Sequence, residues 1–170
     1  MDQKEVCKEF AETFLALEAT ITKFDHQNFN NTPFDGSWTA AQVVQHIILA
    51  SNGFAGVLNA EVQTTERAFD KFVPLLKSDF LNFEHKMKSP DFIKPKLQVY
   101  DRDELWTTIR QISSAIEIEI RALDLSKTCL AFELPVYGFL TRLEAIYFVI
   151  YHTQRHIHQL DEIHRFLSLS

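Results

Sequence analysis

Four stretches of the chain place apolar residues three and four positions apart, which is the period of an amphipathic α-helix with one buried face. The predicted helices cover residues 5–23, 39–58, 103–123 and 141–164. The third has the most regular apolar stripe: Leu105, Ile109, Ile112, Ile116, Ile120 and Leu123. Four long helices of this kind predict an all-α protein with the architecture of a four-helix bundle.

The segments between these helices have the composition of loops. Residues 25–37 are rich in Asn, Pro, Asp and Gly, which favour turns and leave no apolar period. Residues 59–95 are weakly patterned, and Pro90 and Pro95 exclude a continuous helix, so we expect a connection with a short helical piece within residues 66–86. Residues 124–140 include Pro135 and Gly138 among aromatic residues, and we expect this linker to pack over one end of the bundle.

The fourth helix combines a clear start signal with polar residues on its buried face. Thr141 and Glu144 form a T-x-x-E capping box ahead of the apolar run. The residues of the buried stripe are Ala145, Phe148, His152, His156, Gln159 and Ile163. His152 and His156 are four positions apart and therefore lie on one side of the helix. Burying an imidazole without a partner costs about 1–3 kcal/mol, so a ligand or a hydrogen bond must compensate.

His46 lies on the buried face of the second helix and completes a set of three core-facing histidines with His152 and His156. Two neutral imidazoles on adjacent turns can converge on a metal ion, and a third from another helix completes a three-histidine site with an open position, as in catalytic zinc sites. The alternative for each is a core histidine hydrogen-bonded to a carbonyl group or to water. We expect the other histidines to be ordinary loop, surface or rim residues: His26, His85, His158 and His164.

Two known helical metal motifs do not match. His152 and His156 have the spacing of H-E-x-x-H, but Thr153 stands where that motif has the glutamate that acts as general base. A di-iron bundle needs Glu-x-x-His on two helices and two further carboxylates, and only Asp161 with His164 has a comparable spacing.

The composition indicates one domain, residues 1–170, with a substantial core, because 46% of the chain is hydrophobic. A formal charge of -6 without a basic stripe argues against nucleic acid or an anionic membrane as the main partner. Cys7 and Cys129 lie far apart and suggest neither a disulfide framework nor a thiolate zinc site. The N-terminus is charged where a signal peptide is apolar, and no run approaches the ~18 apolar residues of a membrane span, so we expect a cytoplasmic protein.

Three short motifs in order resemble the DinB/YfiT-like family of metalloenzymes. They are W-T followed by a histidine at Trp38–His46, Pro-x-x-Gly at Pro135–Gly138, and H-x-x-x-H-x-x-Q at His152–Gln159. The resemblance implies a four-helix bundle, often a homodimer, that holds a divalent ion such as nickel or zinc with three histidines. By this similarity the ligands are His46, His152 and His156. Several members of the family are S-transferases or isomerases that depend on a low-molecular-weight thiol.

The resemblance therefore favours a thiol-dependent S-transferase acting on small electrophiles, in which the ion lowers the pKa of a bound thiol. A metal-dependent hydrolase that activates water, and a non-enzymatic metal-binding or ligand-binding bundle, are the alternatives. Gln159 is a candidate for orienting a ligand from outside the coordination shell. Arg155 is a candidate for neutralising an anionic substrate, or else a solvated arginine paired with Asp161 or Glu162. Tyr137 is a candidate for lining the entrance, and no residue is assigned as catalytic acid or base.

Overall fold

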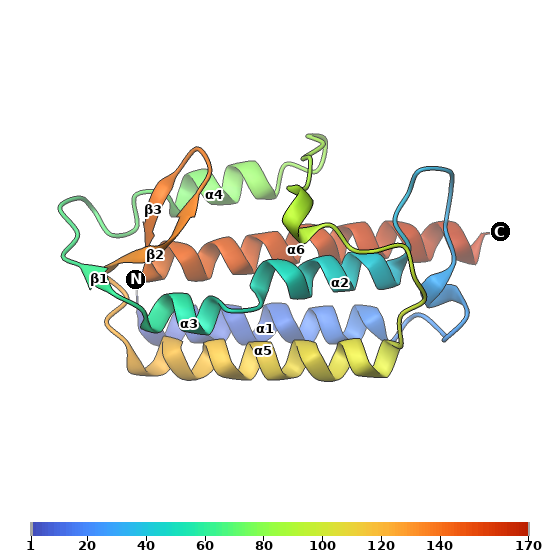
Figure 1. Ribbon diagram of the computed structural model, residues 1–170, viewed down its shortest axis with the longest axis horizontal. Coiled ribbons are helices and arrows are strands. Elements are labelled where there is room, and N and C mark those ends of the chain that lie inside the picture. The colour runs from blue at the N-terminus through green and yellow to red at the C-terminus, as the bar shows by residue number, and fades with distance from the viewer. Residues whose placement is uncertain (1, 170) are drawn as a thin grey trace.

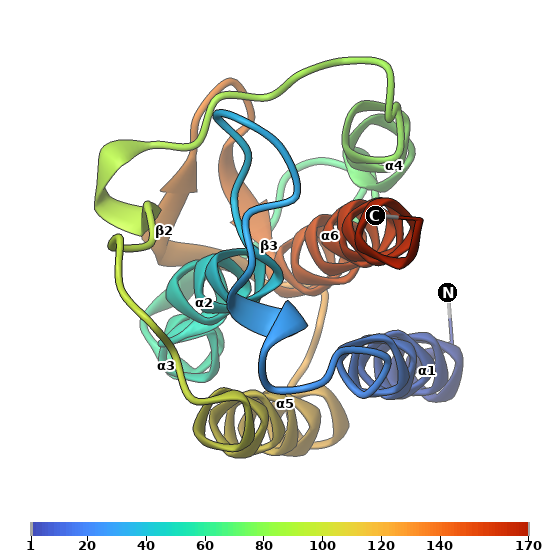
Figure 2. The same ribbon diagram turned by 90° about the vertical axis from the view of Figure 1, so that its right-hand side faces the viewer.

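The computed structural model describes residues 2–169 and shows a bundle of four long helices with smaller elements at its periphery (Figure 1). The bundle helices are α1 (Gln3–Ile21), α2 (Ala40–Ser51), α5 (Arg102–Ala122) and α6 (Arg142–Ser168). The other elements are α3 (Phe54–Asn59), α4 (Val73–Phe80), the 3-10 helices η1 (Asn28–Asn30) and η2 (Asp91–Ile93), and the strands β1 (Val62–Gln63), β2 (Thr128–Leu134) and β3 (Gly138–Thr141). Viewed along the bundle, α1, α2, α5 and α6 surround one core, and α4 lies outside it against α6 (Figure 2). The predicted four-helix architecture is confirmed.

Side-chain caps determine where the bundle helices begin. The Thr141 side chain accepts a hydrogen bond from the backbone N–H of Glu144, and the Glu144 side chain accepts one from the backbone N–H of Thr141, which confirms the predicted capping box. Thr39 and Gln42 form the same reciprocal pair at the start of α2. Asp101 caps α5. The two helices that carry the core-facing histidines therefore start at positions set by their own sequence.

The helix run Ala40–Asn59 belongs to the core of the bundle. It is long and apolar enough to cross a membrane by length and composition, with a mean hydropathy of 1.2. However, 56% of that window is buried inside the fold, as in the core helix of a folded domain. The run is also interrupted, contrary to the continuous helix predicted to about Leu58. Asn52 ends α2, and Gly53, with φ of 93°, makes a left-handed turn before α3.

The linker between α5 and α6 folds as a β-hairpin, which the sequence analysis did not predict. β2 pairs with both β1 and β3 in antiparallel fashion, giving a three-stranded sheet of order β1-β2-β3. The sheet lies at one end of the bundle, in contact with α3 and the start of α6 (Figure 1). The linker thus packs over one end of the bundle as expected, but in a different conformation.

Replacing Val136 with glycine is expected to stabilise the hairpin. Val136 has φ of 77°, and its side chain is fully exposed. The left-handed region costs an L-residue about 1–2 kcal/mol, and the larger chain entropy of glycine offsets part of the gain, so the free energy of unfolding should rise by about 1 kcal/mol. Urea unfolding measures the change. Val99→Gly is the control, because Val99 is also exposed but has a negative φ. This variant should not raise the free energy of unfolding. A Val136→Gly variant with the same free energy of unfolding as the wild type would contradict the strain argument.

Candidate metal centre

Three histidine side chains from two helices meet in the core of the bundle. His46 comes from α2, whereas His152 and His156 come from α6. Nε2 of His152 lies 3.1 Å from Nε2 of His46 and 3.2 Å from Nε2 of His156. One nitrogen from each ring lies within 4.8 Å of the others, and all three residues are buried. The structure thus brings together the three histidines that the sequence analysis singled out.

The outer nitrogens of two rings determine where their lone pairs point. Nδ1 of His46 lies 2.8 Å from the carbonyl oxygen of Ile93, and Nδ1 of His156 lies 2.8 Å from Oε1 of Gln159. Both oxygens can only accept, so each Nδ1 carries the proton and each neutral ring has its lone pair on Nε2. Nε2 of His152 can donate to only one of these two lone pairs. At least one of the close nitrogen pairs therefore has no proton between its members.

A divalent cation fits this arrangement of donors. Imidazole nitrogens bind zinc at about 2.0–2.1 Å, so neighbouring ligands of a tetrahedral ion lie about 3.3 Å apart. The observed separations of 3.1 and 3.2 Å are close to that value. Imidazole ligands suit zinc, nickel, copper and iron, and three of them leave a position open for water or substrate. The donor set indicates a divalent metal without selecting its identity.

Burial keeps the three imidazoles neutral. Desolvation lowers the pKa of His46 below 6.5, although the hydrogen bond to Ile93 opposes this effect. Desolvation, with smaller contributions from the other two rings and from Arg155, holds the pKa of His152 well below 6.5. Desolvation and the neighbouring His46 lower the pKa of His156 to about 3. Neutral imidazole is the form that binds metals, so the cluster is ready to bind an ion at neutral pH.

The metal-free protein is expected to lose stability as the pH falls from 6.5 toward 3. His156 titrates near 6.5 in the unfolded chain but only at about 3 in the folded protein, so the unfolded state binds more protons in this interval. Between pH 7 and pH 5, His156 alone should lower the free energy of unfolding by about 2 kcal/mol. Urea unfolding with a chelator present measures the loss. In the His156→Gln variant, which has no imidazole at this position, the drop in the free energy of unfolding between pH 7 and pH 5 should be smaller by about 2 kcal/mol than in the wild type. Equal drops in both proteins would contradict the role given to His156.

Aromatic rings enclose the histidine cluster. The ring centroid of Trp38 lies 5.1 Å from that of His46, and those of Phe148 and Phe80 lie 5.7 and 6.1 Å from that of His152. The exposed fractions of His46, His152 and His156 are only 3%, 7% and 8%. Apolar walls exclude water and strengthen electrostatic interactions inside them. The cluster therefore lies in a largely apolar environment.

Gln159 lies where the sequence analysis placed it, on the turn after His156, and its amide oxygen accepts the hydrogen bond from Nδ1 of that residue. Arg155 does not pair with Asp161 or Glu162, and its role toward an anionic substrate stays a prediction. Its guanidinium donates to backbone carbonyl oxygens of residues 80, 82 and 85. Asp161 and Glu162, its expected partners, pair with Lys23 and Arg165 instead.

Tyr137 lies on the hairpin, on the side that faces α4. Its hydroxyl donates to Asp79, and its ring packs edge-on against Phe72. Within residues 2–169, Tyr137 makes no hydrogen bond or ring contact with the three histidines. The structure therefore does not bring Tyr137 to the cluster.

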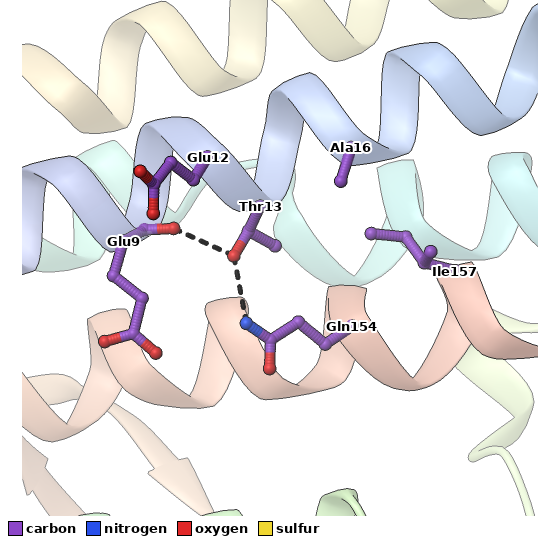
Figure 3. A pocket seen from close by; sticks show the side chains of 6 residues that line it. All are labelled: Glu9, Glu12, Thr13, Ala16, Gln154 and Ile157. Carbon is purple, nitrogen blue, oxygen red and sulfur yellow. Dashed lines mark hydrogen bonds between the residues drawn. The ribbon is translucent and has the colours of Figure 1, made fainter.

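Two surface hollows are separate from the histidine cluster. The first lies between α1 and α6 (Figure 3) and is lined by Glu9, Glu12, Thr13, Ala16, Gln154 and Ile157. Nε2 of Gln154 donates to Oγ1 of Thr13 at 3.1 Å, which ties the two helices together there. The second hollow lies near the C-terminal end of α6. None of the three histidines lines either hollow, so neither provides access to the cluster.

The Ile93 carbonyl and the aromatic enclosure were not predicted from the sequence. A backbone carbonyl has no residue-type signal, and Ile93 lies in the weakly patterned segment before α5. One signal was available, because Pro90 and Pro95 exclude a continuous α-helix there and leave carbonyl groups free to accept other donors. The aromatic residues come from separate elements, and no local spacing connects them.

Comparisons with known proteins agree with this fold. No curated protein matches the chain significantly. Among solved structures, YfiT from Bacillus subtilis, described as a probable metal-dependent hydrolase with an unusual four-helix bundle topology, matches with a TM-score of 0.62 and 16% identity. The match covers 98% of this chain and 87% of that chain, and at this identity it shows the fold alone. The family model of the DinB superfamily matches residues 9–160, and the chain therefore belongs to the DinB superfamily.

Proposed function

We propose that this protein is a divalent-metal-dependent enzyme acting on small molecules, with His46, His152 and His156 as the ligands of the ion. The proposal depends on one observation, the meeting of three buried Nε2 atoms with separations of 3.1 and 3.2 Å around His152. Buried polar atoms are normally satisfied, and a cation satisfies all three lone pairs at once. The description of YfiT as a probable metal-dependent hydrolase supports the same class of chemistry.

The residues of this chain orient the ligands and exclude water. Gln159 and the Ile93 carbonyl accept the Nδ1 protons of His156 and His46, which turns their Nε2 atoms toward the common centre. Trp38 and Phe148 form apolar walls beside the rings. When bound, a divalent ion supplies Lewis acidity and lowers the pKa of a coordinated water or thiol.

Hydrolysis is the first candidate reaction because YfiT, which shares the fold, is described as a probable hydrolase. Transfer of a thiol to an electrophile is the second candidate. In the part of the chain that the structure describes, no carboxylate forms a hydrogen bond or ion pair with the three histidines. A thiolate attacks without a general base, whereas attack by water benefits from one.

Metal analysis followed by activity assays tests the proposal. Protein purified without an affinity tag should contain, or take up, about one divalent ion per chain. The loaded protein is then incubated with activated esters and amides, and separately with an electrophile and a panel of low-molecular-weight thiols. Turnover without thiol identifies a hydrolase, and product formation that needs both thiol and metal identifies a transferase. Protein that takes up neither nickel nor zinc overturns the proposal.

A further inference from the structure

The chain between α4 and α5 passes over the side of the bundle where the histidines meet. We call residues 81–100 the connector. In Figure 2 the connector leaves α4, crosses outside α2 and descends to the start of α5. Its only regular element within the described residues is η2 (Asp91–Ile93). The connector therefore depends on contacts with its neighbours for its position.

Arg155 on α6 holds the beginning of the connector. Its guanidinium donates to the carbonyl oxygen of Phe80 at 3.1 Å, to that of Asn82 at 2.9 Å, and to that of His85. Phe80 is the last residue of α4, so the positive charge lies at the negative end of that helix dipole. Next to these contacts, the His158 ring of α6 stacks on Phe83 with a centroid separation of 4.0 Å.

The middle of the connector contacts the metal centre directly. The Ile93 carbonyl oxygen accepts the Nδ1 proton of His46 at 2.8 Å. Three residues further on, the Lys96 carbonyl oxygen lies 3.4 Å from Nε2 of Gln42, which is on the same helix as His46. A hydrogen bond to the outer nitrogen fixes both the tautomer and the orientation of a ligand imidazole. The position of the connector therefore decides where the His46 lone pair points.

We propose that Arg155 is a positioning residue for the metal centre: it anchors the connector to α6, and the anchored connector holds the Ile93 carbonyl that orients His46. The inference rests on the proposed function only in that the oriented nitrogen is a metal ligand. α6 then acts on all three ligands, because it carries His152 and His156 itself and sets His46 through Arg155. A planar guanidinium spreads five donors over three nitrogens and reaches carbonyl oxygens that lie apart, whereas the three donors of a lysine all come from one nitrogen.

Limited proteolysis of metal-free protein tests the anchor. Lys86 and Lys88 are exposed residues of the connector and give trypsin two cleavage sites. With a chelator present, cleavage at these sites should be about tenfold faster in Arg155→Met and in Arg155→Lys, because the charged hydrogen bonds to the connector are lost or incomplete. Arg165→Met is the matched control, since Arg165 is an exposed arginine of α6 that pairs with Glu162. Rates in the Arg155 variants within about twofold of the wild type overturn the proposal.

Nitrogen NMR of the imidazoles, in the same metal-free samples, tests the coupling to His46. In the wild type and in Arg165→Met the proton of His46 should reside on Nδ1, whereas Arg155→Met should show it shared with Nε2. A purely structural role would lower stability without changing the tautomer in the folded protein, so an unchanged tautomer overturns the proposal. Both measurements are made without metal. If the wild type binds no ion, the proposed function is wrong. The two measurements on metal-free protein still decide whether Arg155 positions His46.

Discussion

Replacing Glu144 with alanine is expected to lower the free energy of unfolding by about 3–5 kcal/mol, because it removes the fully buried member of an ion pair whose other member, Arg67, is partly buried. The Glu144 carboxylate is fully buried and accepts two hydrogen bonds from Arg67, both at 2.6 Å. It also accepts the backbone N–H groups of Phe72 at 2.8 Å and Thr141 at 2.9 Å. The variant removes the acceptor that these four donors share. The Thr141 hydroxyl still donates to the Phe69 carbonyl oxygen, so one hydrogen bond between the segment before α4 and the start of α6 remains.

Chemical unfolding monitored by circular dichroism measures the loss. Glu162→Ala is the matched control on the same helix, because Glu162 is exposed and its pair with Arg165 contributes at most about 1 kcal/mol. Glu144→Gln keeps one acceptor oxygen and should fall between the two variants. A loss below about 1 kcal/mol for Glu144→Ala would show that water replaces the carboxylate at little cost.

Replacing His152 with alanine is expected to reduce the affinity for nickel or zinc by at least about a hundredfold. His152 is the central member of the cluster, since its Nε2 approaches both other rings, at 3.1 and 3.2 Å. Loss of a group that only orients a ligand lowers metal affinity by about 10–100-fold, so loss of a ligand should exceed that range. Titration against a chromophoric chelator measures the affinity.

His26→Ala is the control for a general loss of histidine, because His26 is exposed in the loop after α1. It should bind the ion as the wild type does. Equal affinity in His152→Ala and the wild type would place the ion elsewhere. Far-ultraviolet circular dichroism in the presence of a chelator confirms that both variants remain folded.

Local periodicity was sufficient to predict the helices and the histidines that they carry. The stripe through His152 and His156 depends only on the helical repeat, and the capping box at Thr141 depends only on residues three positions apart. His46 could be placed on a buried face in the same way. The approach of His46 to His152 is a tertiary contact. The three buried faces made it one of two alternatives, and the family resemblance selected it.

The elements that were missed depend on contacts between distant segments. β2 does alternate, with Leu130, Phe132 and Leu134 more buried than Ala131 and Glu133, but a strand is stable only when another strand pairs with it. The acceptors of Arg155 are backbone carbonyl oxygens of residues 80, 82 and 85, which have no signature in the sequence. The sequence made Arg155 a candidate for a substrate contact or a surface ion pair, but it could not show what the guanidinium contacts.

The distance along the chain between the three histidines would make the stability of the protein depend on the proposed metal ion. His46 and His152 are separated by 106 residues, so an ion bound to both acts as a cross-link across most of the chain. An unfolded chain holds such a link only at an entropic cost that grows with the length of the closed loop. The ion therefore favours the native state, by an amount that rises with the logarithm of its free concentration. If the proposed ion binds, a cell short of the metal would hold less of the folded protein.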